Sequence, residues 1–539
     1  MFIRIVINLG LLLILLAIIP KQRLFAQEPP DPSDSPPVST SSSSSDSETF
    51  TNKVYLPMIN VGASASTTGS FWIEDDELDP ALAPSEEALW PDEDGPLFDG
   101  STLVHAAANP ATVVDGTEDY RALGYPDARK LVRNSQGHLY AAYRKKVNNR
   151  YRIFVAESTD RGATWRVLNN GQPIEAVGDY TQRVPAIAID NQDRLHLVWY
   201  GNDAANSNAT NTSNEREIKY TRSSPTTAAS ITWTQWTNLY DGEGYDGSSL
   251  WQEHPTLYVN GTNVYVVWES SKAGKQEIKF LRSTDYGETW SGVTAIQPSK
   301  RVLFSRPTLV VSYAEEQRYL YVVAYGTKNG IARLFWTRSP DNGDTWDKWR
   351  PVAPGKTDQR HASVARDDNG RLHIVWRQVR GKQTILRYRV YDPAKRRGKG
   401  GWVGGPKTIV SVRKECLYFP SIAISGKNRD GDMSDNDMVW VVWTQSTDCT
   451  SVPRDNPLDG QIYLAQLGPN GKWSKPEALM PPGRHLYPTL RRANSPSSTA
   501  GNVELLWVDA TGGELDVAGE RVVCEGGGCV VKHVSLAPW

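Results

Sequence analysis

The sequence predicts an all-β protein, a β-propeller of seven four-stranded blades, with six blades as the alternative. Two observations predict this fold. A short apolar segment beside a proline recurs every 52 to 70 residues from residue 120 onward, each time followed by a turn, a strand ending in an aromatic residue and a third strand. The 539 residues also include 43 Gly and 34 Pro beside 19 Trp and 23 Tyr. This composition suits many short strands joined by tight turns and argues against a helical bundle.

The repeated units open at corresponding positions. These openings are Pro126, Pro185, Pro255, Pro307, Ala362, Pro420 and Pro488. Four short strands per unit make a propeller blade, and the ring must close because each blade buries its faces only against its neighbours. We expect residues 530–535 to supply the outer strand of the last unit, and residues 101–114 to add a clasping strand.

Three units carry the same turn, Ser-x-Asp-x-Gly-x-Thr-Trp, at residues 158–165, 283–290 and 339–346. In such a turn the aspartate accepts backbone N–H groups and the glycine adopts a conformation closed to other residues. Trp165, Trp290 and Trp346 are therefore expected at equivalent outer positions. The turn is the Asp-box, and residues 120–535 resemble the sialidase superfamily of Asp-box (BNR-repeat) propellers, of the secreted bacterial type. Asp-boxes identify a fold rather than an activity, and seven units depart from the six blades usual in that family.

The N-terminal region has the pattern of an export signal. Arg4 precedes an apolar run over residues 6–20, and Ala26 offers a small-residue cleavage point. Residues 27–100 are rich in Pro and Ser and then acidic, a composition that cannot bury a core. We expect a signal peptide over 1–26, a disordered linker over 27–100 and the propeller over 101–539. The protein would be secreted or held at the cell surface, with no transmembrane domain after cleavage; an uncleaved anchor is the alternative.

Four cysteines in an exported chain fit two disulfides. Cys524 and Cys529 flank the segment Glu-Gly-Gly-Gly, so we expect them to close one hairpin. Cys416 and Cys449 would then pair within a single repeat.

The formal net charge of −2 is unevenly distributed along the chain. The first 100 residues carry 16 acidic and 4 basic side chains, so the remainder sums to +10. A basic body fits an anionic partner, while the overall charge gives no reason to invoke nucleic acid.

Candidate binding residues lie beside the opening prolines, because the first strand of each blade lines the axial channel of a propeller. The residues expected to bind a substrate there are Arg183, His254, Arg306, Arg360, His361 and Tyr418. Guanidinium groups bind carboxylates in a bidentate fashion, so this set suits a carboxylated sugar.

The resemblance to sialidases implies a sharper assignment. Those enzymes hold the substrate carboxylate with three arginines, here matched by Arg183, Arg306 and Arg360. They use a tyrosine nucleophile activated by a glutamate, and the resemblance implies Tyr487 with Glu253 for this pair and Asp203 as the acid/base residue. Three features depart from the pattern: Gln182 replaces the aromatic residue before the first arginine, a whole blade separates Glu253 from Arg306, and the residues around Asp203 do not match.

One acidic segment raises the question of a metal. Its carboxylates are Asp430, Asp432, Asp435 and Asp437. Alternating carboxylates suit Ca²⁺, but Asp435 stands where a calcium loop needs glycine, so we favour an acidic surface turn and no cofactor.

The leading functional hypothesis is an exported, monomeric propeller that recognises a glycan, preferably an acidic one, at its axial pocket. The alternatives are an exo-sialidase-like glycoside hydrolase and a non-catalytic scaffold for protein interactions at the cell surface.

Overall fold

The computed structural model describes residues 110–125, 128–175, 180–202, 216–240, 250–272, 275–425, 438–449, 457–468, 471–492, 503–516 and 521–536. The expected signal peptide and linker lie outside the described residues. So do Asp203 and the four aspartates at positions 430, 432, 435 and 437. No helix in the described ranges is long and apolar enough to cross a membrane.

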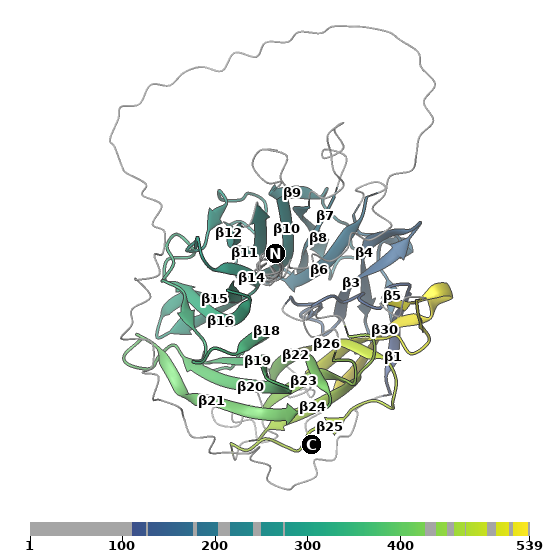
Figure 1. Cartoon of the computed structure of the whole chain (residues 1–539). Coiled ribbons are helices and arrows are strands. Elements are labelled where there is room, and N and C mark those ends of the chain that lie inside the picture. The colour runs from purple at the N-terminus through teal and green to yellow at the C-terminus, as the bar shows by residue number, and fades with distance from the viewer. Residues whose placement is uncertain are drawn as a thin grey trace, which may run out of the picture. The chain divides into compact units, whose positions relative to one another are not determined.

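The described residues form an all-β ring of seven four-stranded blades, as Figure 1 shows. Their helical content in the element order is limited to single 3₁₀ turns, η4 (Asn169–Gly171) and η6 (Glu525–Gly527). The propeller prediction is therefore confirmed, with seven blades rather than six.

Blades 1 to 6 each consist of four strands that are consecutive in the chain and pair in that order. Blade 1 contains β2 (Leu131–Arg133), β3 (Leu139–Val147), β4 (Arg150–Ser158) and β5 (Arg166–Val167). Blade 2 contains β6 (Gln182–Ile189), β7 (Arg194–Gly201), β8 (Glu217–Pro225) and β9 (Thr237–Tyr240). Blade 3 contains β10 (Leu250–Asn260), β11 (Asn263–Lys272), β12 (Lys275–Ser283) and β13 (Thr294–Ala295).

The next three blades follow the same plan. Blade 4 contains β14 (Leu303–Ala314), β15 (Gln317–Lys328), β16 (Ile331–Ser339) and β17 (Arg350–Pro351). Blade 5 contains β18 (Asp358–Arg366), β19 (Leu372–Arg380), β20 (Gln383–Asp392) and β21 (Gly401–Val412). Blade 6 contains β22 (Cys416–Ser425), β23 (Met438–Ser446), β24 (Gln461–Leu467) and β25 (Glu477–Ala478).

Blade 7 closes the ring with a strand from the other end of the propeller. Its order is β26 (His485–Arg492), β27 (Val503–Asp509), β30 (Cys529–Leu536) and β1 (Thr112–Thr117). A small hairpin, β28 (Glu514–Leu515) and β29 (Val522–Val523), lies between β27 and β30 in the chain. Figure 1 shows β1 beside β30.

The expectation for the last outer strand was wrong. Residues 530–535 belong to β30, which is the third strand of blade 7, and the outer strand is β1. The clasping strand thus exists, but over 112–117, with Thr112 opposite His533 and Thr117 opposite Cys529. Pairing the first strand with the last one joins the two ends of the ring by a hydrogen-bonded ladder, which removes an open sheet edge.

The hydrophobic core is divided among the interfaces between blades. Between blades 2 and 3, for example, Ala186 and Val198 pack in one cluster with Leu257 and the fully buried Trp268. Each face of a blade is buried only by the neighbouring blade. All seven repeats therefore need apolar side chains along their strands.

The three Asp-boxes have the same geometry. In the box of blade 3, Asp285 accepts the Thr289 backbone N–H at 2.9 Å and its hydroxyl at 2.6 Å, and the Ser283 hydroxyl accepts the Gly287 N–H at 2.7 Å. Each box tryptophan contacts a ring on the third strand of the preceding blade. The ring-centroid distances are 5.2 Å for Trp165–His533, 4.8 Å for Trp290–Tyr220 and 5.3 Å for Trp346–Phe280. The equivalent outer positions are confirmed, and the tryptophans join neighbouring blades.

The ring has two distinct ends, which we call the Asp-box end and the bulge end. In blade 3, Leu250 at the start of β10 pairs with Lys272, next to the β11–β12 connection. Ser283, which opens the Asp-box, pairs instead with Val264 near the other end of β10. Every first strand therefore starts at the end of the ring opposite the Asp-boxes, and the residues flanking the opening prolines belong to the bulge end.

Candidate functional site

The first strand of each blade from 2 to 7 contains the same β-bulge, located at the residue that opens the repeat. Their ladders shift register there, and the residue just before the opening position has a positive φ in each case. These residues are Val184 (38°), His254 (50°), Arg306 (49°), His361 (55°), Phe419 (49°) and Tyr487 (55°). Proline fits at this point because a bulge leaves one residue without a ladder hydrogen bond. A left-handed conformation costs a residue with a Cβ about 1–2 kcal/mol, which the surrounding sheet must offset.

The bulges bring side chains from different blades together at the axis. The centre of this group is Tyr125, which precedes β2 and is 9% exposed. Its ring-centroid distances are 5.1 Å to His254, 6.3 Å to His361, 5.6 Å to Phe419 and 6.5 Å to Tyr487. The Arg306 guanidinium carbon lies 3.6 Å from the centre of the Tyr125 ring. We call these six residues the axial cluster.

The sequence analysis missed Tyr125 and Phe419. Both could have been found by taking, in every unit, the residue immediately before the opening position: Tyr125 precedes Pro126 and Phe419 precedes Pro420. Polar and aromatic residues on either side of the proline, in contrast, include side chains that face different surroundings.

The three predicted arginines illustrate this difference. Arg306 occupies the bulge position, whereas Arg183 and Arg360 each stand one residue earlier. Arg183 lies 5.9 Å from the ring of Tyr151 in blade 1. Arg360 binds Asp358 at 3.0 Å within its own strand. The described contacts of the three guanidinium groups thus differ, and their assignment to one substrate carboxylate stays a prediction.

The two residues of the predicted nucleophile pair occupy different kinds of position: Tyr487 is a bulge residue, whereas Glu253 stands one residue before the bulge residue His254. Glu253 forms an ion pair with Arg216. Tyr487 is 1% exposed and stacks on Phe419 with a centroid distance of 4.7 Å. Burial raises the pKa of the Tyr487 hydroxyl well above its ordinary value, the opposite of what a nucleophilic phenol needs. The Tyr487–Glu253 pair stays a prediction, which the burial of Tyr487 does not favour.

Tyr418 stands one residue before the bulge residue Phe419, and the centroids of the two rings are 6.0 Å apart. It is fully buried, and its hydroxyl donates to the Asp448 carbonyl at 2.8 Å. His361, in contrast, belongs to the axial cluster: its ring meets Phe419 edge-on at 5.0 Å, and its Nδ1 lies 3.4 Å from the Arg306 guanidinium.

A carboxylate of the second strand, Glu269 in β11, supports the polar side of the cluster. It is 5% exposed and lies 3.3 Å from His254 Nδ1, while the Arg306 backbone N–H donates to it at 3.1 Å. Burial acts to raise the pKa of Glu269, but His254 and Arg306 outweigh it and hold the pKa below its ordinary value. Glu269 is therefore ionised at neutral pH and orients both bulge residues.

Glu253, His254 and Glu269 are also the residues that could hold a metal ion. One ligand atom from each lies within 4.8 Å of the others. Both carboxylates already accept N–H groups, Glu253 from Arg216 and Glu269 from Gln276 and Arg306. Two guanidinium groups beside these carboxylates disfavour a further cation, so the geometry is that of an ion-pair cluster.

Both predicted disulfides are present, and both lie at the bulge end. Cys416 at the start of β22 pairs with Cys449 beyond β23, and Cys524 pairs with Cys529 at the start of β30. They tie down the longer connections on the side of the ring that carries the axial cluster.

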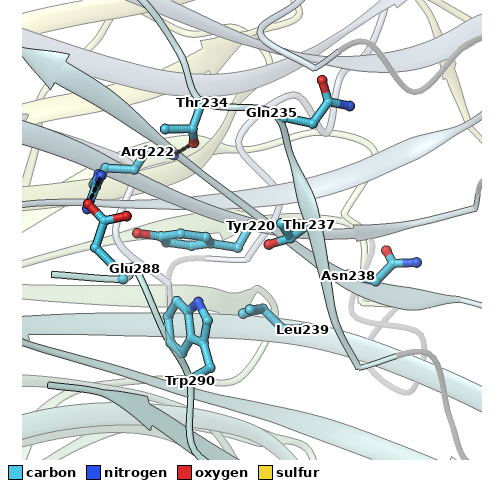
Figure 2. Close-up of a pocket in the computed structure, with 10 residues that line it drawn as sticks. Tyr220, Arg222, Thr234, Gln235, Thr237, Asn238, Leu239, Glu288 and Trp290 are labelled. Carbon is cyan, nitrogen blue, oxygen red and sulfur yellow. Dashed lines mark hydrogen bonds and ion pairs between the residues drawn. The ribbon is translucent and has the colours of Figure 1, made fainter. Parts of the chain in front are cut away.

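A separate hollow of about 290 Å³ lies between blades 2 and 3 at the Asp-box end. Figure 2 shows Tyr220 next to Trp290, with Arg222 bound to Glu288 at 2.6 Å. Because Trp290 and Gly287 belong to an Asp-box, the lining of this hollow is explained by the joint between the two blades.

Comparisons with known proteins agree with this fold. Residues 193–396 match the model of the BNR repeat-like domain. No curated protein matches the chain by sequence. This match lies within the seven-bladed ring and agrees with the repeats that the Asp-boxes indicated.

Several solved structures are similar to this chain. A polysaccharide lyase of family PL25, an ulvan lyase bound to an oligosaccharide of glucuronic acid and sulfated rhamnose, is 11% identical, with a TM-score of 0.49 over 78% of this chain and 95% of its own. The intramolecular trans-sialidase from Ruminococcus gnavus is 13% identical, with a TM-score of 0.39 over 79% and 98%. The NanB sialidase from Streptococcus pneumoniae is 12% identical, with a TM-score of 0.37 over 80% and 71%. This similarity concerns the fold and does not identify the chemistry of this chain.

Proposed function

We propose that this sialidase-like propeller recognises an acidic glycan at the bulge end of its axial channel. The carrying observation is the stack of Arg306 on Tyr125, flanked by two imidazoles. A guanidinium held over an aromatic ring offers a positive charge and hydrogen-bond donors for a carboxylate or sulfate, and an aromatic surface beside it suits the apolar face of a sugar ring.

The surroundings supply further polar contacts for a saccharide. Arg216 and Arg360 stand beside the cluster and are partly exposed, with 14% and 18% of their side chains accessible. Both already bind a carboxylate, Glu253 and Asp358 respectively. They would therefore contact sugar hydroxyls or exchange partners with an acidic group, whereas Arg306 lies at the centre of the axial cluster, where we expect the acidic group to bind.

The test is binding of sialylated and uronate-containing oligosaccharides to the exported protein. Arg306→Gln should weaken binding of the best ligand by about 10- to 100-fold, because a charge-assisted contact in a shielded site contributes about 1.5–3 kcal/mol. The matched control is Arg350→Gln, an exposed arginine that also stacks on an aromatic ring but belongs to the outer strand β17. If wild type retains none of these glycans, the protein-scaffold hypothesis takes precedence.

Glycan cleavage is a second candidate, and the His254–Glu269 pair favours it. A carboxylate 3.3 Å from Nδ1 favours the tautomer protonated there, which leaves Nε2 as a proton acceptor. Turnover of an acidic oligosaccharide that is lost in His254→Gln but kept in Tyr487→Phe would support this role. Turnover of a fluorogenic sialoside that is lost in Tyr487→Phe would instead restore the sialidase-type tyrosine nucleophile.

A further inference from the structure

The axial channel has a second end, on the Asp-box side, and arginines from three blades reach into it. Arg129 precedes β2, Arg366 ends β18, and Arg491 lies near the end of β26. In the bulged strands these positions follow the bulge: Arg491 is four residues beyond Tyr487, about 13 Å along an extended strand. We call Arg129, Arg366 and Arg491 the channel arginines, and they are distinct from the axial cluster.

Side-chain size explains how Arg129 and Arg491 enter the channel, while Arg366 stands one residue further along its own strand. At the third position after the opening residue, blades 1, 3 and 7 carry the long side chains Arg129, Tyr258 and Arg491. The corresponding residues of the other four blades are Ala188, Val310, Ala365 and Ala423. The small residues leave space at the axis that the long ones fill.

One contact shows that the side chains meet across the channel. The Arg129 guanidinium carbon lies 4.3 Å from the centre of the Tyr258 ring. Arg129 belongs to blade 1 and Tyr258 to blade 3, so blade 2 separates them around the ring and the contact must lie on the axial side of blade 2. Tyr258 is partly exposed although it packs against two core clusters, as expected for a residue lining a channel.

The three positive charges act on this one tyrosine. Burial raises the pKa of the Tyr258 hydroxyl, but Arg129, Arg366 and Arg491 outweigh burial and bring the pKa below its ordinary value. A phenol that ionises more readily despite burial reports a strongly positive potential at its oxygen.

Two of the three channel arginines have no carboxylate to balance their charge. Among the described residues, Arg129 and Arg366 form no ion pair with a carboxylate, and they contact the rings of Tyr258 and Tyr313 instead. Like charges gathered in a narrow channel raise the free energy of the folded state until a counter-ion enters.

We propose that the Asp-box end of the axial channel is an oxyanion-binding site, in which the channel arginines and the Tyr258 hydroxyl hold a sulfate, phosphate or carboxylate group. Guanidinium groups match the geometry of such anions through paired N–H donors, and the phenol supplies a further O–H donor. This site is independent of glycan recognition at the bulge end.

The direct test is calorimetric titration with inorganic sulfate at constant ionic strength, against a chloride background. Wild type should bind sulfate, and Arg129→Gln should weaken binding at least tenfold, the usual consequence of losing one charge-assisted contact. Arg350→Gln, outside the channel, should bind as wild type does. A sulfated monosaccharide titrated in parallel identifies the source: binding as tight as that of inorganic sulfate admits a sugar-borne group, and weaker binding assigns the site to the free ion.

A spectroscopic readout needs no variant in the arginines. Tyr258 should be among the first tyrosines to ionise in an ultraviolet pH titration, and that early step should be missing in Tyr258→Phe. Sulfate should move the step to higher pH, because a bound anion offsets the positive charge that favours the phenolate. Absence of sulfate uptake by wild type, or an early ionisation step that sulfate leaves unchanged, would overturn the proposal.

Discussion

The two ends of the ring use one repeated backbone in opposite ways. At the Asp-box end, three blades keep the same side chains in the same hydrogen bonds, and each box tryptophan packs on the preceding blade. At the bulge end, six blades keep the same left-handed bulge but fill it with five different residue types. Identical side chains on a repeated backbone indicate a structural joint, whereas varied side chains on a repeated, strained backbone indicate a binding site.

The two ends are also stabilised by different means. Short hydrogen-bonded turns hold the Asp-box end, while both disulfides lie at the bulge end. The repeated Asp-box side chains therefore stabilise one end of the ring. The variable side chains lie at the other end, where the connections are longer and disulfides stabilise them.

The largest expected effect comes from placing a side chain on an Asp-box glycine. Gly343 has a φ of 98°, and an added Cβ would lie 2.3 Å from the Phe280 ring of the preceding blade. Gly343→Ala should therefore lower the free energy of unfolding by about 4 kcal/mol, from backbone strain and steric overlap together. Chemical denaturation of the variant and wild type measures this loss in the free energy of unfolding.

The control for that substitution is Gly330→Ala. Gly330 also has a positive φ, 79°, but an added Cβ would meet nothing within 4 Å. It should cost only about 1 kcal/mol, the strain alone. Equal losses in the two variants would contradict the view that the Asp-box joint is a steric fit between blades.

Removing the disulfides tests the covalent support of the bulge end. Cys416 and Cys449 are 33 residues apart and Cys524 and Cys529 only 5. Replacing the first pair with serine should cost about 3 kcal/mol and the second about 2 kcal/mol, because a longer closed loop restricts the unfolded chain more. Thermal unfolding of the two double variants checks the order, and a larger loss from the short loop would show that local geometry dominates.

A buried carboxyl on the connection between blades 1 and 2 predicts a pH dependence for the bulge end. Burial raises the pKa of Glu175 to about 7, although Arg152 binds it at 2.6 Å. Between pH 4.5 and 7 the folded protein therefore binds more protons at this site than the unfolded chain, so the free energy of unfolding falls as pH rises through this window, by about 2–3 kcal/mol.

Glu175→Gln is the matched variant for this effect, since its side chain has the same shape and does not titrate. Its stability should change less than that of wild type between pH 4.5 and 7, and the difference between the two profiles isolates Glu175. Parallel profiles would assign the pH dependence to other groups.

The smallest expected effect concerns the Asp-box carboxylate. Asp285→Ala removes the acceptor for Thr289, so it should cost about 1 kcal/mol, because the turn is exposed and water replaces part of what is lost. Hydrogen bonds from Ser283 and Thr289 lower the pKa of Asp285 to about 2. The contribution should therefore be fully present above pH 4 and disappear as pH falls toward 2, which equilibrium unfolding of both proteins in acid would reveal.

The sequence by itself determined what depends on neighbouring residues. Each opening proline marks a bulge that forms within one strand, each Asp-box closes its hydrogen bonds within eight residues, and Cys524 lies five residues from its partner. Seven such units already imply seven blades, because a blade is a local structure.

Only the tertiary structure decided which side chains meet. Tyr125 and Tyr487 lie at opposite ends of the propeller sequence, yet their rings are 6.5 Å apart because the ring closes through β1. Arg183 and Arg306 look alike beside their prolines, but a shift of one residue relative to the bulge directs them to different partners. The opening proline marks the bulge within each repeat, but convergence at the axis also depends on contacts across the whole ring, which leave no pattern within a single repeat.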